Sequence, residues 1–205
     1  MPPLTSGVDA SVSCAPIAGR LKSSGRSFVC RYYANSGKKR LTANEAKVLS
    51  SAGLRVVAVW EDGYPTKAAY FSYAKGVDDG SSAYHDAISL GQPSGSAIYF
   101  AVDFDASEAE VTGVISDYFR GIAAGFAAIS QGAPVYLIGV YGSGLTCSSI
   151  RTQDLAKYSW LSLSTGWRGY SFRAWNITQK PGKPVMGIAL DYDEATDDSG
   201  GFTIG

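Results

Sequence analysis

The sequence predicts an α/β fold in which about eight strands close into a compact barrel. Short apolar runs alternate with helical stretches for about five rounds, and about three further strands then follow in quick succession. Alternating strand–helix units favour a parallel sheet, and eight strands favour closure. A full eight-fold barrel of this kind needs about 250 residues. A chain of 205 residues can therefore form the barrel only in a shortened version, for example one that lacks the late helices. The alternative is an open, doubly wound sheet.

The expected strands are rich in β-branched and aromatic residues, and several are apolar throughout. Such runs are typical of strands that are buried on both faces, as in parallel sheets. The expected strands are 7–9, 28–33, 54–60, 97–102, 135–141, 159–163, 172–175 and 187–190.

Helices are expected between the early strands, with start and stop signals at their ends. Thr42 and Glu45 have the spacing of a capping box, as do Ser107 and Glu110. Glycines at helix ends predict where the helices stop. The five expected helices begin near Pro16, Thr42, Gly80, Ser107 and Leu145.

Composition indicates one globular domain spanning residues 1–205, with a core at about 7–194. Hydrophobic residues make up 45% of the chain, and 18 basic residues balance 18 acidic ones. A neutral chain has no general attraction for nucleic acid, so nucleic-acid binding is not expected. No apolar run is long enough to span a bilayer, and no secretory signal is recognisable. The single histidine and three scattered cysteines give no zinc motif, so neither a metal nor a cofactor is expected.

Acidic residues follow several of the predicted strands. In a parallel barrel, chemistry takes place at the carboxyl ends of the strands. Asp9 ends the first strand, Glu61 the third, Asp103 and Asp105 the fourth, and Asp191 and Asp193 the last. Any one of these acids could instead cap the next helix or belong to a turn.

Asp103 and Asp105 are the strongest candidates, because Ser107 already provides the cap of the next helix. Their i, i+2 spacing at a strand end lets both side chains point to one face. Two carboxylates held close together cannot both ionise easily, so one pKa rises and that group can act as an acid. Glycoside hydrolysis needs such a pair of carboxyl groups.

Aromatic residues accompany these acids. The residues expected to form walls of sugar subsites are Tyr33, Trp60, Tyr141 and Trp175. Sugar rings present apolar faces that stack on aromatic rings, although aromatics at strand ends also commonly pack beneath loops.

An ordered set of short motifs resembles a known family. The motifs are Gly7-Val8-Asp9, the run 28–33, Leu41-Thr42-x-x-Glu45, the run 98–105 and Val140-Tyr141-Gly142. Together they resemble the bacterial glycoside-hydrolase-like domains once labelled DUF1906, the Rv2525c-like group, which are related to the GH25 (Chalaropsis-type) lysozymes. The resemblance covers about residues 7–194 and implies a compact, TIM-like (β/α)5β3 barrel with an acidic pocket.

The resemblance also implies roles for particular acids. Asp9 matches the acid that closes the first strand, and Asp191 matches an acid on the last strand. The fourth strand of GH25 enzymes ends in Asp-x-Glu, whose Glu is the proposed proton donor. Either Asp105 or, in another register, Asp103 occupies that position here, and Glu61 could supply a longer carboxylate.

These observations predict a muramidase that cleaves the β-1,4 bond between N-acetylmuramic acid and N-acetylglucosamine in peptidoglycan, with Asp191 and Asp193 binding sugar hydroxyls. The protein is expected to be a monomer that acts outside the cytoplasm, as an antibacterial effector exported by a specialised route or as a lysin. An immunity protein or a secretion-system component is a candidate partner. The alternatives are a non-catalytic glycan-binding module and a hydrolase of another envelope polysaccharide.

Overall fold

The predicted barrel is confirmed: in the computed structural model, eight strands follow one another around a closed barrel in chain order. The structure describes residues 4–35, 37–130, 135–196 and 198–205. The strands are β1 (Thr5–Asp9), β2 (Phe28–Tyr33), β3 (Arg55–Trp60), β4 (Ala97–Ala101), β5 (Leu137–Gly142), β6 (Tyr158–Leu161), β7 (Ile177–Lys180) and β8 (Asp191–Ala195).

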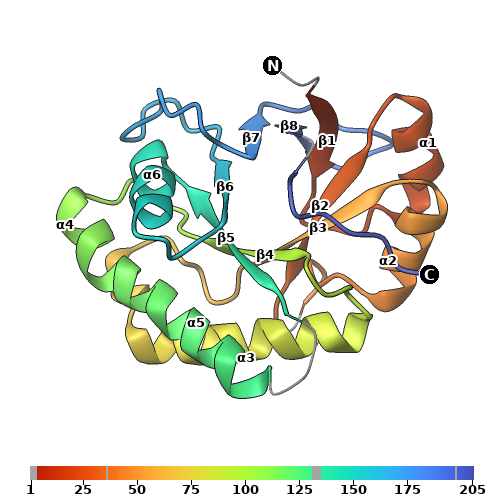
Figure 1. The fold of residues 1–205 in the computed structure, drawn as a ribbon. Coiled ribbons are helices and arrows are strands. Elements are labelled where there is room, and N and C mark those ends of the chain that lie inside the picture. The colour runs from red at the N-terminus through yellow and green to blue at the C-terminus, as the bar shows by residue number, and fades with distance from the viewer. Residues whose placement is uncertain (1–3, 36, 131–134, 197) are drawn as a thin grey trace.

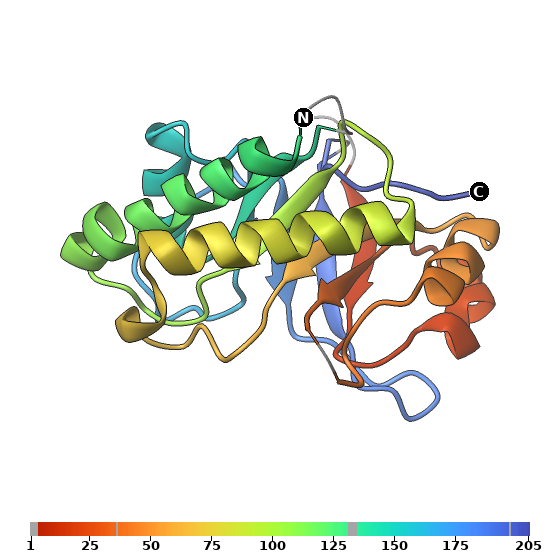
Figure 2. The same ribbon diagram turned by 90° about the horizontal axis from the view of Figure 1, so that it is seen from below.

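Helices cover only part of the barrel (Figure 1). The helices are η1 (Ala15–Ile17), α1 (Ala18–Ser23), α2 (Ala43–Ser51), η2 (Ala68–Tyr70), α3 (Tyr73–Leu90), α4 (Glu108–Glu110), η3 (Val111–Ile115), α5 (Ser116–Ile129) and α6 (Gly144–Thr152). Helices α3 and α5 lie side by side along one flank, and α1 and α2 lie together on another (Figures 1 and 2). In the described part of the chain, no helix follows β6 or β7. None of the described helices is long and apolar enough to cross a membrane.

The last two strands differ from the expected ones. Residues 172–175 lie in a loop, and β7 begins only at Ile177. Residues 187–190 are also not a strand, and β8 begins at Asp191 and runs antiparallel to both β7 and β1. Asp191 therefore opens its strand rather than following it. Because β8 runs in the opposite direction, Asp191 still lies at the same end of the barrel as Asp9, its partner in register.

Side chains alternate between the barrel interior and the helical layer, as in any strand. In β3, Val57 and Val59 belong to the inner cluster, whereas Val56, Ala58 and Trp60 pack in the outer cluster. Both faces are apolar, so the sequence of β3 shows no alternation. In each strand, the set of alternate residues that points inward decides which side chains face the open carboxyl end of the barrel.

The two predicted capping boxes differ in the structure. Ser107 and Glu110 form a complete box, with reciprocal bonds between each side chain and the other residue's backbone. Thr42 accepts from the backbone of Glu45, but the Glu45 carboxylate instead binds the guanidinium of Arg31 at 2.8 Å. This buried ion pair ties α2 to the outer face of β2.

The amino-terminal end of the barrel is closed by the C-terminal tail. The Tyr99 hydroxyl, inside the barrel, donates to the carbonyl of Ser199 at 2.9 Å, and Phe202 pairs with Val56. Solvent therefore enters the barrel interior from the carboxyl end.

Candidate active site

Inward-pointing side chains from all eight strands or their ends gather at the carboxyl end of the barrel. Two adjoining cavities lie there and share Tyr32. The first, of about 90 Å³, is lined by Tyr32, Val59, Glu61, Asp103, Tyr141, Trp160 and Gln179. The second, of about 200 Å³, is lined by Asp9, Ala10, Ser11, Tyr32, Ala189, Leu190 and Asp191. The structure thus brings together four of the six predicted acids around two cavities, which we call the acidic pocket.

Asp103 is the inward residue that follows β4. Its backbone amide donates to the carbonyl of Pro65 at 2.9 Å, which fixes the chain where it leaves the strand. Partial burial raises the pKa of Asp103 and the neighbouring Glu61 carboxylate raises it further, whereas Lys39 lowers it. A carboxyl group with a raised pKa keeps its proton closer to neutral pH and can donate it to a leaving group.

Glu61, which follows the neighbouring strand β3, lines the same cavity as Asp103 in a different electrostatic environment. Lys39 Nζ lies 2.9 Å from its Oε1, and the same ammonium group lies over the ring of Tyr32 at 5.3 Å. The two carboxyl groups of the cavity therefore differ in their partners: Glu61 forms an ion pair with Lys39, whereas Asp103 forms none among the described residues.

Asp9 lies deeper, at the boundary between the two cavities. Gln179 Nε2 donates to its Oδ2 at 2.8 Å. Burial raises the pKa of Asp9 to about 6, and the nearby Asp191 carboxylate adds to this effect, while the bond from Gln179 opposes it. Asp9 can therefore exchange a proton in the range in which many hydrolases work.

Asp193 does not reach the acidic pocket, although it was expected to bind substrate. It lies one inward position below Asp191 and has no exposed surface. Its Oδ1 accepts a bond from the indole of Trp160 at 3.0 Å. Burial, together with the neighbouring Asp9, raises the pKa of Asp193 well above its ordinary value. A protonated Asp193 can donate to Asp9 from below.

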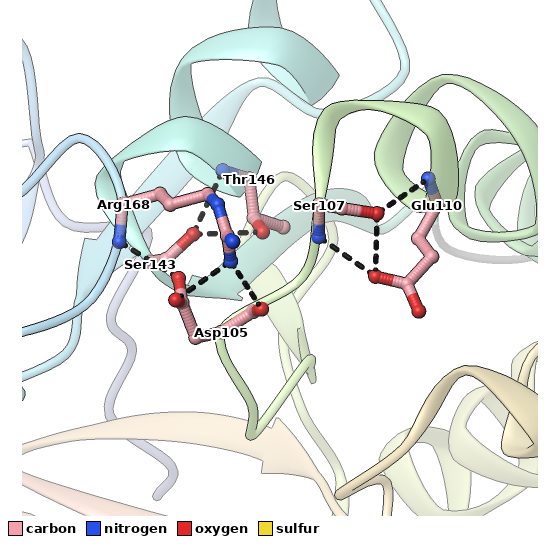
Figure 3. A network of polar contacts seen from close by, with 6 residues as sticks. All are labelled: Asp105, Ser107, Glu110, Ser143, Thr146 and Arg168. Atoms are coloured by element: carbon pink, nitrogen blue, oxygen red, sulfur yellow. Dashed lines mark hydrogen bonds and ion pairs between the residues drawn. The ribbon is translucent and has the colours of Figure 1, made fainter.

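Asp105 points away from the pocket and is bound by Arg168 (Figure 3). The backbone amide and the guanidinium of Arg168 each lie 2.7 Å from its carboxylate oxygens, and the guanidinium also binds its carbonyl at 2.9 Å. These contacts anchor the loop after β6 on the loop after β4. Of the two registers left open by the sequence, Asp103 has the position inside the pocket.

Three of the four expected aromatic walls are also elsewhere. Tyr33 and Trp60 are outward residues of β2 and β3, each 1% exposed in the core, and the Tyr33 hydroxyl donates to Gln92 at 2.6 Å. Trp175 lies just before Asn176, whose amide bonds to Ser159 at the start of β6, so it belongs to the opposite end of the barrel. Only Tyr141 lines the pocket.

Three residues with aromatic or amide side chains that line the first cavity were not among the predicted site residues: Tyr32, Trp160 and Gln179. In β2, Cys30 and Tyr32 point inward and Tyr33 points outward, but both faces of the strand are buried, so the sequence carried no signal that favoured Tyr32 over Tyr33. Gln179 had no signal either, since β7 was not recognised. Among the described residues, no group of three His, Cys, Asp or Glu side chains is arranged to hold a metal ion.

The fold and the site define a TIM-like α/β barrel with an acidic pocket at its carboxyl end. A sequence model of the Rv2525c-like, glycoside hydrolase-like domain matches residues 19–195. The chain belongs to that family.

The chain is also similar to individual proteins. The chain is 38% identical over 172 residues to the uncharacterized protein YbfG of Bacillus subtilis, covering 78% of this chain but only 23% of that protein. The Tat-secreted protein Rv2525c of Mycobacterium tuberculosis, in complex with L-tartrate, superposes with a TM-score of 0.79 at 19% identity, over 97% of this chain and 99% of that one. A muramidase from Trichobolus zukalii superposes with a TM-score of 0.58 at 14% identity, over 95% and 94%. These two structures show the same fold.

Proposed function

We propose that the protein hydrolyses the glycan strand of peptidoglycan, at the β-1,4 bond between N-acetylmuramic acid and N-acetylglucosamine. The observation that carries this proposal is the pairing of Asp103 with Glu61 in one cavity at the carboxyl end of the barrel. The structural similarity to a muramidase supports the choice of glycan.

In the proposed reaction, Asp103 donates its proton to the glycosidic oxygen as the bond from that oxygen to the anomeric carbon breaks. Glu61 accepts a proton from the attacking water, or it orients the N-acetyl group of the substrate as an internal nucleophile. In both routes one water molecule is consumed, and its hydroxyl group ends on the anomeric carbon. Asp9 and Asp191 bind sugar hydroxyls, and Asp9 adjusts the charge of the pocket.

A non-catalytic glycan-binding module is the second candidate. The ion pair between Lys39 and Glu61 favours it, because a carboxylate engaged by an ammonium group is less available to an attacking water molecule. The shorter side chain of Asp103, where GH25 enzymes have Glu, favours it as well. A third candidate is hydrolysis of another envelope polysaccharide by the same residues.

Action outside the cytoplasm follows from this substrate. One structural neighbour is a Tat-secreted protein, which supports the same location. An exported antibacterial effector or a lysin would fit such an activity.

The test is to incubate the wild-type protein with purified peptidoglycan and measure new reducing ends and soluble muropeptides. Asp103→Asn keeps the size of the side chain but removes its transferable proton, so release should fall by at least about a hundredfold. Asp105→Asn is the matched control, because Asp105 faces Arg168 outside the pocket. It should retain most of the activity.

Three outcomes separate the candidates. Muramic-acid reducing ends that are lost in Asp103→Asn alone support the muramidase. Binding to sacculi without release supports the binding module and overturns the catalytic proposal. Release from other polysaccharides, but not from peptidoglycan, supports the third candidate.

A further inference from the structure

The most exposed aromatic side chain outside the pocket is that of Tyr64, in the loop after β3. Its side chain is 82% exposed. Among the described residues, its ring makes no aromatic or cation–π contact and its hydroxyl no hydrogen bond. The acidic pocket begins three residues earlier, at Glu61. An aromatic ring held in water forgoes the stabilisation of about 1.5–3 kcal/mol that burial of a large apolar side chain provides.

The backbone of Tyr64 is also in a conformation that aromatic residues rarely adopt. Its φ is +62°, and Gly63 before it has φ +74°. A bulky residue in the left-handed region costs on the order of 1 kcal/mol or more, and such strain clusters at functional sites. Glycine would occupy this position without strain, yet a tyrosine is present.

The loop is bonded on both sides of Tyr64. On one side, the carbonyl of Asp62 accepts from the Tyr70 hydroxyl at 2.7 Å, and its carboxylate accepts from Asn35 at 2.8 Å. On the other side, the carbonyl of buried Pro65 accepts from the amide of Asp103 at 2.9 Å. The loop runs along the same edge of the barrel as the loop after β4 (Figure 2). The ring therefore projects from a backbone that is fixed relative to Asp103.

The acidic pocket is too small to account for recognition of a polymer. Its two cavities hold about 90 and 200 Å³, whereas a site for one small molecule commonly holds about 300–1,000 Å³. A glycan chain that places one bond beside Asp103 must therefore leave most of its sugar rings outside the pocket. The loop that carries Tyr64 leads out of the pocket from Glu61.

We propose that Tyr64 is the stacking platform of an outer subsite, which binds a pyranose ring of a polymeric glycan as the chain leaves the acidic pocket. The proposal rests on the proposed function, since it assigns a second binding position to the same substrate. The apolar C–H face of a sugar covers the exposed ring, and the fixed loop keeps the entropy lost on binding small. Tyr64 thus gives preference for long chains over short fragments.

The test measures binding to sacculi by co-sedimentation, and to a soluble peptidoglycan tetrasaccharide, for three variants. Tyr64→Gly removes the ring and suits the left-handed backbone, so it should fold with an unchanged or higher Tm. Tyr64→Phe keeps the ring. Met186→Gly is the matched control, because Met186 is also an exposed apolar residue at positive φ, on the loop between β7 and β8, and is 69% exposed.

Tyr64→Gly should bind sacculi about three- to tenfold more weakly than the wild type, with the affinity for the tetrasaccharide unchanged. Tyr64→Phe and Met186→Gly should bind both ligands like the wild type. Equal loss in Tyr64→Gly and Met186→Gly, or no loss in Tyr64→Gly, would overturn the stacking subsite. Because binding is measured without turnover, an inactive wild type that loses affinity only in Tyr64→Gly would contradict the hydrolase and still support the subsite. A wild type that binds no sacculi would overturn both.

Discussion

The indole of Trp160 and the carboxyl group of Asp193 are joined by a 3.0 Å hydrogen bond inside the barrel, below the acidic pocket. Trp160 is part of the pocket wall, whereas Asp193 is inaccessible to solvent. The remaining carboxyl oxygen, Oδ2, accepts no hydrogen bond from the described residues. Because the pKa of Asp193 is raised by burial and by the neighbouring Asp9, a protonated Asp193 can donate to Asp9 and so link the wall of the pocket to one of its acids.

Asp193→Asn should stabilise the protein at neutral pH. The pKa of Asp193 is raised on folding, so above pH of about 4 the unfolded chain loses a proton that the folded chain keeps. The free energy of unfolding therefore falls as pH rises. Asparagine keeps the acceptor for Trp160 and supplies a donor toward Asp9 without this penalty. We expect a gain on the order of 1 kcal/mol or more at pH 7, measured by urea unfolding.

The same variant should show a flatter pH dependence of stability between pH 4 and 7. Part of the slope should remain, because the pKa of Asp9 is also raised, to about 6. Asp193→Ala is the comparison, since it leaves the Trp160 indole without its partner and should destabilise the protein at every pH. An Asp193→Asn protein that loses stability at pH 7 would show that Asp193 is ionised in the folded state.

Lys39→Met should shift the alkaline limb of the pH–activity profile upward. The Lys39 charge lowers the pKa of Asp103, so its removal lets that pKa rise and keeps Asp103 protonated to higher pH. The measurement is kcat/KM for peptidoglycan release across pH 4–9. Lys38→Met is the control, because the neighbouring Lys38 is exposed and pairs with no acid among the described residues. A shift to lower pH in Lys39→Met would exclude Asp103 as the proton donor.

The buried ion pair between Arg31 and Glu45 should be costly to break. Arg31 is 0% exposed and Glu45 is 2% exposed, and the carboxylate of Glu45 also accepts from the amide of Cys14 at 2.8 Å. Arg31→Met leaves a buried carboxylate without its cation, so the free energy of unfolding should fall by about 3–5 kcal/mol. The double variant Arg31→Met/Glu45→Gln should recover part of this loss. Additive losses in the double variant would show that the two residues act independently.

Gly76→Ala should separate helices α3 and α5. A Cβ at Gly76 would collide with the carbonyl oxygen of Tyr118, and backbone atoms cannot move aside easily. We expect a loss of about 1–3 kcal/mol in the free energy of unfolding. Gly19→Ala in α1 is the control, because nothing lies within 4 Å of its Cβ, and alanine in a helix should stabilise by about 0.5–1 kcal/mol. Similar effects of the two substitutions would argue against close helix packing.

Much of the fold could be predicted because its signals are local. The Ser107–Glu110 capping box and the stop at Gly91, which has φ +81°, depend on residues a few positions apart. The two late strands could not be predicted, since residues 172–175 are as aromatic as a strand but are held in a loop by contacts made elsewhere. One such contact is the anchor of Arg168 on Asp105, 63 positions earlier.

The candidate site could be predicted in part for the same reason. Asp9 ends β1, Glu61 follows β3 and Asp103 comes just after β4, so their place at the carboxyl end is determined by the order of elements. Whether an aromatic side chain lies beside these acids depends on whether it is one of the alternate residues of its strand that point into the barrel. In β2 and β3 both faces are buried, so no alternation in the sequence distinguishes Tyr32 from Tyr33 or marks Trp60 as outward.

The sequence by itself determined the first six strands and their order, the barrel class and the end of the barrel at which the acids gather. These properties follow from hydrophobic runs, caps and chain order. Only the tertiary structure decided that Asp105 is bound outside the pocket, that Asp193 is buried beneath it and that β8 runs in the opposite direction. Those outcomes depend on partners far apart in the chain, Arg168 and Trp160 among them, whose approach is set by packing and closure of the barrel rather than by local sequence.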